Sequence, residues 1–234
     1  MPSEYNLCRQ TTRRNPQISP ALSVNAPTRV LLIRHAETAA PNVFHGAESD
    51  IGLSEKGLRD SEAIAPILAL ERPVAIISSA MKRAVETATP IARACDLPVT
   101  IESALHERRI GPLAGQRYDA NKGPWAETLR RWQAGDLDYA ANEGAESFLA
   151  VRDRVLPVWN RLAESYAGQT YLIVAHGAVI KILLLSLDFG IRMDAPVWDD
   201  FSCPNLRPYQ LAMIQGSWYL DWNRNPDDHC VGIK

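Results

Sequence analysis

Two patterns of hydrophobic and polar positions alternate along this chain. Short apolar runs at 29–33, 74–77 and 171–175 are each followed by polar residues, as expected for strands that are buried on both faces of a sheet. The longer segments between these runs carry apolar residues at helical spacing. The pattern therefore predicts strands that alternate with helices.

Capping residues and prolines indicate where these helices begin and end. Ser54 is predicted as the N-cap of the first helix, and Ser78 or Ser79 as the N-cap of the second. Pro90 is predicted to end or kink the second helix, and Pro157 to bend a later one. The first helix thus lies between the first two predicted strands.

The rest of the chain continues the alternation, with one interruption. A helix from about 145 to 166 leads into the strand at 171–175, and a further helix follows. Short strands are predicted at 99–101 and as a closing pair within 210–221. The segment of about 107–142 has only one helical pattern, which predicts a small cap insertion. We expect an α/β three-layer sandwich, with a mostly parallel central sheet and helices on both faces.

The length of the chain predicts one compact domain, since 234 residues with 46% hydrophobic residues can bury a full core. We assign this domain to residues 29–234. Residues 1–28 are predicted to be a partly disordered N-terminal extension, because they contain three arginines and one acid but no apolar run. A transit peptide is the alternative interpretation of this extension.

Charge and cysteine content exclude several classes of partner. A net charge of -2 gives no general attraction to nucleic acid or to an anionic membrane. The longest apolar stretch, 178–187, is interrupted by Lys181 and is too short to cross a bilayer. The four cysteines form no Cys-x-x-Cys pair, which argues against a zinc site or a disulfide scaffold. We expect a cytoplasmic protein without metal or other cofactor, and the sequence leaves its oligomeric state open.

Side chains suited to phosphate chemistry follow the predicted strands. Arg34 and His35 follow the first strand, Arg83 comes shortly after the second, and His176 follows the strand at 171–175. In a parallel sheet, reactive groups gather at the carboxyl ends of the strands. Arginine can hold two phosphate oxygens, and a neutral imidazole can attack phosphorus. Each residue alone also has a purely structural interpretation, so the hypothesis of phosphoryl transfer depends on their joint placement.

Four segments give the chain a resemblance to the histidine phosphatase superfamily, which includes cofactor-dependent phosphoglycerate mutases and many phosphatases. Residues 34–38 (Arg-His-Ala-Glu-Thr) are similar to its Arg-His-Gly-Glu-Thr signature, and residues 52–57 resemble the Leu-Thr-x-x-Gly that opens its first helix. Residues 78–84 resemble its Ser-x-Leu-x-Arg-Ala, and residues 175–177 its second histidine. The resemblance therefore covers most of the predicted domain.

This resemblance implies a role for each matching residue. It makes His35 the nucleophile, and it makes Glu107 the proton donor because the segment 105–111 looks like the family's Leu-x-Glu-x-x-x-Gly. Weaker echoes of the family occur at 144–147 and 225–229. The residues implied to bind the phosphate and the rest of the substrate are Arg34, Arg83, His176, Thr38, Asn42 and Gly177.

Two positions near the nucleophile depart from the family's pattern. Ala36 replaces a glycine, and we expect this change to be tolerated because it adds a single methyl group. The family often has an asparagine six residues after the nucleophile, where this chain has Pro41. Asn42 comes one residue later, which makes it the candidate for the same contact.

The short cap favours a phosphatase over a mutase. Mutases of the family carry a long insertion between the acid and the second histidine, whereas Glu107 and His176 are only 69 positions apart (176 minus 107). A smaller cap lets water reach a phosphohistidine. We therefore expect hydrolysis of a small-molecule phosphomonoester. A phosphoglycerate mutase-type phosphotransferase and a weakly active phosphate-binding module are the alternatives.

Overall fold

A computed structural model describes residues 26–119, 122–187 and 198–220, and its centre is a mixed sheet. Its six strands are β1 (Thr28–Arg34), β2 (Ile76–Ser78), β3 (Val99–Ile101), β4 (Thr170–Ala175), β5 (Pro208–Ile214) and β6 (Ser217–Leu220). They lie in the order β3-β2-β4-β1-β5-β6. The first four strands of this order pair in parallel, whereas β5 and β6 are antiparallel. The predicted mostly parallel sheet and its closing pair of strands are confirmed.

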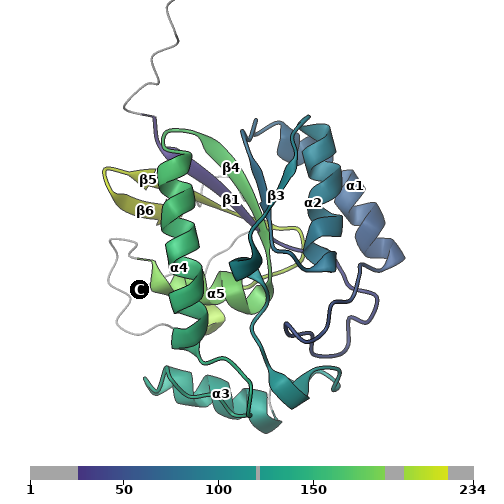
Figure 1. Ribbon diagram of the computed structural model, residues 1–234, viewed down its shortest axis with the longest axis vertical. Helices are drawn as coiled ribbons and strands as arrows, with labels where there is room; N and C mark the ends of the chain where they lie inside the picture. The colour runs from purple at the N-terminus through teal and green to yellow at the C-terminus, as the bar shows by residue number, and fades with distance from the viewer. Residues whose placement is uncertain (1–25, 120–121, 188–197, 221–234) are drawn as a thin grey trace, which may run out of the picture.

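Helices cover both faces of this sheet (Figure 1). They are α1 (Glu55–Ala69), α2 (Lys82–Ala94), α3 (Gly123–Gln133), α4 (Phe148–Ser165) and α5 (Gly177–Ser186). Helices α1 and α2 pack on the face that carries Leu31 and Ile33, whereas α4 and α5 pack on the face of Val30 and Leu32. Successive residues of β1 thus enter two different cores, as the two-residue period of a strand requires. The predicted three-layer sandwich is confirmed.

The start of α1 matches the predicted cap, whereas the start of α2 does not. Ser54 Oγ accepts a hydrogen bond of 2.9 Å from the Gly57 N–H and so caps α1. The N-cap of α2 is Met81, which has no capping side-chain bond, so the predicted caps Ser78 and Ser79 are both wrong. The reason is tertiary, since the Ser79 hydroxyl bonds a histidine ring of another strand end.

Both prolines that are predicted to interrupt helices lie inside them. Helix α2 continues past Pro90 to Ala94, and α4 continues past Pro157 to Ser165. Pro90 therefore does not end α2, whereas the alternative of a kink at Pro90 and the bend at Pro157 stay predictions. A proline removes one backbone hydrogen-bond donor from a helix. In α2 the packing of the next residue offsets this loss, because Ile91 is fully buried against the sheet.

Gly57 brings the first turn of α1 against the polar segment that follows β1. A Cβ at this position would lie 2.2 Å from the carbonyl oxygen of Glu37, so a side chain cannot be accommodated. Ser54 donates to Glu37 twice, from its N–H to the backbone oxygen and from Oγ to the carboxylate. These contacts fix the loop after β1 on the start of α1.

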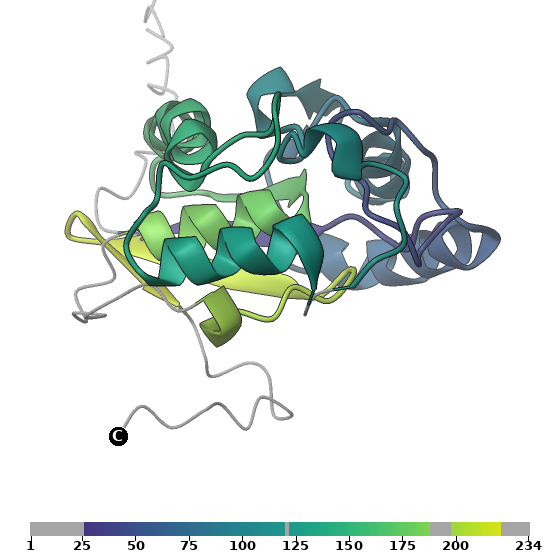
Figure 2. The ribbon, with the colours of Figure 1, turned by 90° about the horizontal axis from the view of Figure 1, so that it is seen from below.

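The predicted cap lies across one end of the sheet. Helix α3 lies below the strands in Figure 1, and Figure 2 shows it crossing this end of the molecule near α5. Its Trp125 and Trp132 pack with Trp198, with ring centroids 5.4 to 5.9 Å apart. The cap is therefore attached to the domain by an aromatic cluster.

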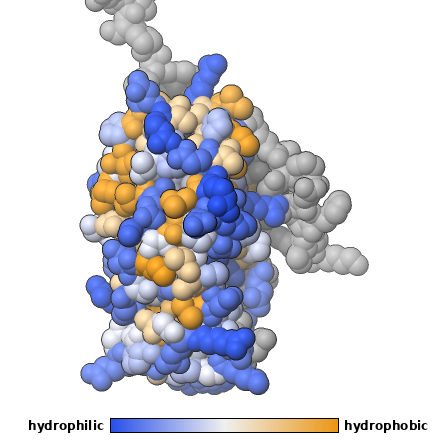
Figure 3. Space-filling model, turned by 90° about the vertical axis from the view of Figure 1, so that its right-hand side faces the viewer, coloured by the Kyte–Doolittle hydropathy of each residue, from blue (hydrophilic) through white to orange (hydrophobic). Residues whose placement is uncertain are grey.

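The outer surface on the side of α1 mixes apolar and polar residues (Figure 3). Within the described residues, no helix is both long and apolar enough to cross a membrane. Residues 1–25 of the predicted N-terminal extension lie outside the described part of the chain, and so does the weak family echo at 225–229.

Candidate active site

The carboxyl ends of three neighbouring strands bring the predicted residues together. The His35 N–H after β1 donates to the carbonyl of Ala175 in β4 at 3.0 Å. The Ser79 N–H after β2 donates to Val174 of the same strand at 3.1 Å. The rings of His35 and His176 lie side by side, with centroids 5.2 Å apart. Residues about 140 positions apart in the chain thus meet at one edge of the sheet.

The imidazole of His35 is held in one tautomer. Its Nδ1 lies 2.7 Å from the carbonyl oxygen of Ala36, which can only accept, so Nδ1 carries the proton and Nε2 keeps a free lone pair. Burial lowers the pKa of His35 well below its ordinary value, and the charges of Arg34 and Arg83 lower it further. The ring is therefore neutral at pH 7, which is the nucleophilic form.

His176 is a second buried, neutral imidazole. Its Nε2 lies 2.8 Å from Ser79 Oγ, which also accepts from the Met81 N–H at 3.3 Å. The hydroxyl proton of Ser79 is then available to Nε2, so that the proton of the ring lies on Nδ1. Burial lowers the pKa of His176, with a further contribution from the charge of Arg83. This ring can donate one hydrogen bond without adding a charge.

One partly buried and one fully buried arginine accompany the histidines. Arg34 donates to the carbonyl of Cys203 at 2.9 Å, and Arg83, which is fully buried, donates to two carbonyls of the loop 46–49. The Nε atoms of both arginines and Nδ1 of His176 are buried without a hydrogen-bond partner in the described residues. Such donors suit an oxyanion, because each can still form a charge-assisted or neutral hydrogen bond.

Glu107 lies at the start of α5. Its Oε1 accepts from the Arg108 N–H at 2.8 Å, and its Oε2 accepts from the Ala178 N–H in the first helical turn at 3.4 Å. Glu107 thus has a defined place next to the end of β4.

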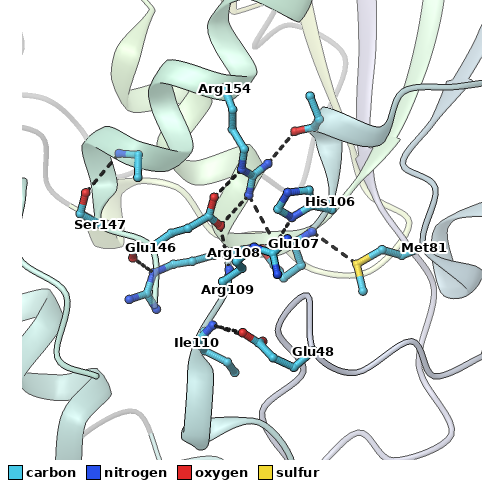
Figure 4. A network of polar contacts seen from close by, with 12 residues as sticks. Glu48, Met81, His106, Glu107, Arg108, Arg109, Ile110, Glu146, Ser147 and Arg154 are labelled. Atoms are coloured by element: carbon cyan, nitrogen blue, oxygen red, sulfur yellow. Dashed lines mark hydrogen bonds and ion pairs between the residues drawn. The ribbon is translucent and has the colours of Figure 1, made fainter. Parts of the chain in front are cut away.

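A network of polar contacts holds the backbone that carries Glu107 (Figure 4). Arg154 of α4 forms a two-point ion pair with Glu146, at 2.7 and 3.0 Å. Arg154 also donates to the carbonyls of Ala104 and Glu107, while Glu146 accepts from the Arg109 N–H at 2.8 Å. The segment 104–109 is therefore fixed to α4 on both sides of Glu107.

These residues border a cavity of about 480 Å³. Among the sequence-predicted site residues, those that line it are Arg34, His35, Thr38, Glu107 and Gly177. Arg83 and His176 are fully buried and act on the cluster from within the protein. Asn42 is exposed and is not among the lining residues, and its backbone carbonyl accepts from Tyr118. The structure thus brings together every predicted site residue except Asn42.

The sequence did not point to two residues that hold the backbone around His35. Asn205 Nδ2 donates to the carbonyl of His35 at 2.6 Å, and Thr87 Oγ1 accepts from the Ala36 N–H at 3.0 Å. Thr87 lies one helical turn after Arg83, and its hydroxyl donates to the Arg83 carbonyl. The four-residue spacing between the two residues is a signal that is present in the sequence. No sequence signal connects Asn205 with a residue 170 positions earlier.

The described residues contain no group of three or more His, Cys, Asp or Glu side chains placed to hold a metal ion. Cys95 and Cys203, the two cysteines in this part of the chain, are free. Burial raises the pKa of Cys203 to about 11, so its thiol is protonated at pH 7 although it lines the cavity. Cys203 is therefore a poor nucleophile.

Comparison with curated proteins finds relatives that cover most of the chain. A metal-independent phosphoserine phosphatase of Arabidopsis thaliana is 35% identical over 165 residues, which cover 68% of each protein. A glucosyl-3-phosphoglycerate phosphatase of Mycolicibacterium vanbaalenii is 29% identical, over 71% of this chain and 76% of the relative. The chain also matches a bifunctional protein of Mycobacterium tuberculosis at 35% identity, but spans only 45% of that protein.

Solved structures and a family model agree with these relatives. A mycobacterial glucosyl-3-phosphoglycerate phosphatase solved with VO3 superposes with a TM-score of 0.70 at 25% identity, and the match covers 82% of this chain and 97% of that one. A family model for the histidine phosphatase superfamily (branch 1) matches residues 30–225. The chain therefore belongs to branch 1 of the histidine phosphatase superfamily and is a histidine phosphatase.

Proposed function

We propose that this protein hydrolyses a small phosphomonoester without a metal ion, through a phosphohistidine on His35 and with Glu107 as proton donor. The observation that supports this most is the tautomer of His35, which is neutral, has a free Nε2 lone pair and borders the cavity. Arg34 and Glu107 line the same cavity. Nucleophile, cation and acid are thus available to one bound phosphate.

In the first step, Nε2 of His35 forms a bond to phosphorus while the bond from phosphorus to the ester oxygen breaks. Glu107 gives its proton to the departing oxygen, which leaves as an alcohol. The guanidinium groups of Arg34 and Arg83 and the N–H of His176 offset the charge on the phosphoryl oxygens. We assign Thr38 and Gly177, which line the cavity, to substrate binding.

In the second step, water attacks the phosphohistidine. A bond from water oxygen to phosphorus forms, the bond from phosphorus to Nε2 breaks, and the Glu107 carboxylate accepts the proton of the water. Inorganic phosphate leaves, and both His35 and Glu107 return to their starting states. The cycle needs no redox partner and no second substrate besides water.

The names of the relatives suggest the substrate class. They refer to phosphatases of phosphoserine and of glucosyl-3-phosphoglycerate, both of which are small phosphorylated metabolites. We propose a substrate of this kind for the present chain. A cytoplasmic location, expected from the cysteine content, stays a prediction.

The first test is hydrolysis of p-nitrophenyl phosphate by wild type and by His35→Ala. We expect the variant to lose at least about 10³-fold in kcat, because no other described group replaces the nucleophile. Rapid quenching of wild type with labelled substrate is expected to trap an acid-labile, alkali-stable phosphoenzyme that His35→Ala does not form. Undiminished turnover by His35→Ala would exclude the proposed mechanism.

Two controls address the alternatives. Incubation with 3-phosphoglycerate and 2,3-bisphosphoglycerate tests for 2-phosphoglycerate, whose formation faster than release of phosphate would indicate a mutase. Wild-type turnover no faster than that of His35→Ala, across a panel of phosphoesters, would indicate a phosphate-binding module. Inhibition by vanadate, which can mimic the transferring group, supports the phosphatase.

A further inference from the structure

A lysine lies in the cavity one helical turn away from the proposed phosphate site. Lys181 belongs to α5 and lines the cavity together with Gly177, four residues earlier on the same helix face. Its Nζ donates to the carbonyl of Trp198 at 3.1 Å and lies 4.9 Å from the centre of that ring. An ammonium group has three donors, so two remain for a ligand.

The charge of Lys181 has no ion-pair partner among the described residues. Burial lowers the pKa of its ammonium group, while the exposed Asp199 acts on it only from a distance. A half-buried cation without a counter-charge in the described part of the chain has lost part of its hydration, and a bound anion would replace it. Lys181 therefore differs from the surface lysine Lys56, which is paired with Asp60.

The wall beside Lys181 is aromatic and carries a second cation. Arg108 lines the cavity with its guanidinium 5.3 Å from the ring centre of Trp125 and 5.1 Å from that of Trp132. Arg108 is accompanied by the carboxylates of Glu107 and of two further glutamates, which raise its pKa against the effect of burial. Of the two cations, Arg108 is the one on which several carboxylates act, whereas Lys181 has no ion-pair partner in the part of the chain that the structure describes.

The position of Lys181 on α5 is one helical turn after the start of that helix. A Cβ at Gly177 would lie 3.5 Å from Nε of Arg34, so α5 begins at the proposed phosphate ligands. Four residues of α-helix advance by roughly 6 Å. In an extended phosphomonoester with two carbons between ester oxygen and carboxylate, phosphorus and the carboxylate carbon are roughly 5 Å apart by ordinary bond lengths. The helix rise and this span are of the same order, so one small substrate can contact both the phosphate ligands and the side of the same cavity that Lys181 lines.

We propose that Lys181 binds a carboxylate of the substrate, so that this enzyme selects phosphomonoesters with a carboxylate on the second carbon from the ester oxygen. This inference rests on the proposed function and narrows it. Lys181 is then a specificity-determining residue, because it binds a part of the substrate that does not react.

The test compares O-phosphoserine with O-phosphoethanolamine, which share the ester and the amino group and differ only in the carboxylate. Wild type is expected to prefer O-phosphoserine by on the order of 10- to 100-fold in kcat/KM, the effect of one charge-assisted hydrogen bond. Lys181→Met, which keeps the length of the side chain without its charge, is expected to lose most of this preference through KM. Lys181→Arg is expected to keep most of it.

Two controls separate this inference from stability and from the proposed function. Lys56→Met, on the exposed face of α1, is expected to keep both the activity and the preference. The pair 3-phosphoglycerate and glycerol 3-phosphate repeats the comparison on wild type alone, so the test does not depend on the folding of a variant.

Each remaining outcome has one meaning. If wild type hydrolyses p-nitrophenyl phosphate but shows no preference in either substrate pair, the carboxylate inference fails and the proposed function stands. A preference that survives in folded Lys181→Met would remove Lys181 from the role. Absence of any hydrolysis by wild type would instead contradict the proposed function itself.

Discussion

At the scale of single residues, the proposed site assigns two tasks to two different groups. The neutral imidazole of His35 attacks phosphorus, and the carboxyl group of Glu107 protonates the leaving oxygen. His35 is neutral because burial and two arginines oppose its protonation. Glu107 lies against the Ala178 N–H of α5. In the proposed mechanism, the two residues therefore do not compete for a proton.

Substitution Glu107→Gln tests this division of roles. Hydrolysis of alkyl phosphates needs a proton on the leaving oxygen and is expected to slow on the order of 10²- to 10⁴-fold. Hydrolysis of aryl phosphates, whose leaving groups depart readily, is expected to slow much less. The measurement is kcat for O-phosphoserine and p-nitrophenyl phosphate. Glu62→Gln, an exposed carboxylate of α1, serves as the control. Equal slowing of both substrates would remove Glu107 from the role of acid.

The residues that could be predicted from sequence differ physically from those that could not. His35 stands in a contiguous motif directly after an apolar strand, so chemistry and location are both local features. Asn205 reaches the His35 carbonyl only because β5 pairs with β1. Ser79 was predicted as a helix cap, since serine favours that position, but its hydroxyl bonds His176 of a neighbouring strand. The contacts of Asn205 and Ser79 depend on which strands are neighbours in the sheet, and local sequence does not reveal this.

At the scale of elements, helix α4 supports the segment that carries the proposed proton donor, Glu107. The Arg154–Glu146 pair ties the backbone of residues 104–109 to this helix, and its two side chains are only 17% and 14% exposed. The pair has two hydrogen bonds, which fixes its geometry as well as its charge. The position of Glu107 therefore depends on a residue of the helix behind it.

Removal of this support has a matched control on the same helix. Arg154→Met is expected to destabilise the protein by about 3 kcal/mol, because it leaves the Glu146 carboxylate, which is only 14% exposed, without its ion-pair partner. Arg161→Met breaks an ion pair of the same 2.7 Å length with Glu102, but that arginine is 54% exposed, so about 1 kcal/mol or less is expected. Chemical denaturation measures both.

A second readout distinguishes positioning from stability alone. At a temperature where both variants are folded, Arg154→Met is expected to slow alkyl phosphates more than aryl phosphates. The same selectivity is expected of Glu107→Gln, since both substitutions affect the proposed proton donor. Arg161→Met is expected to slow neither selectively. If the two variants show identical substrate profiles, the Arg154–Glu146 ion pair has a structural role only.

At the scale of the whole molecule, the two buried histidines make stability depend on pH. The pKa of each is lowered in the folded state below the ordinary value of 6.5, so the unfolded chain binds more protons once the pH falls through that value. Stability is therefore complete above about pH 6.5 and is lost progressively below it. Each histidine contributes a slope of up to about 1.4 kcal/mol per pH unit.

Thermal unfolding between pH 7.5 and 5 measures this dependence. The wild-type melting temperature is expected to fall below about pH 6.5, and the double variant His35→Asn, His176→Asn is expected to show a flatter profile, because it lacks both titrating groups. Vanadate is expected to raise the wild-type melting temperature at every pH at which it binds. A wild-type profile that is flat to pH 5 would contradict the neutral, buried state of the two rings.

The place of β1 in the sheet also has a consequence for the biosynthesis of the protein. This strand is made early, yet both of its edges are paired with strands that begin at residues 170 and 208. At about 5 to 20 residues per second, the nascent chain carries this apolar strand unpaired for roughly 7 to 30 seconds. Exposed strand edges are sites of aggregation. Expression yield should therefore depend on chaperones that bind the emerging chain before its second half leaves the ribosome.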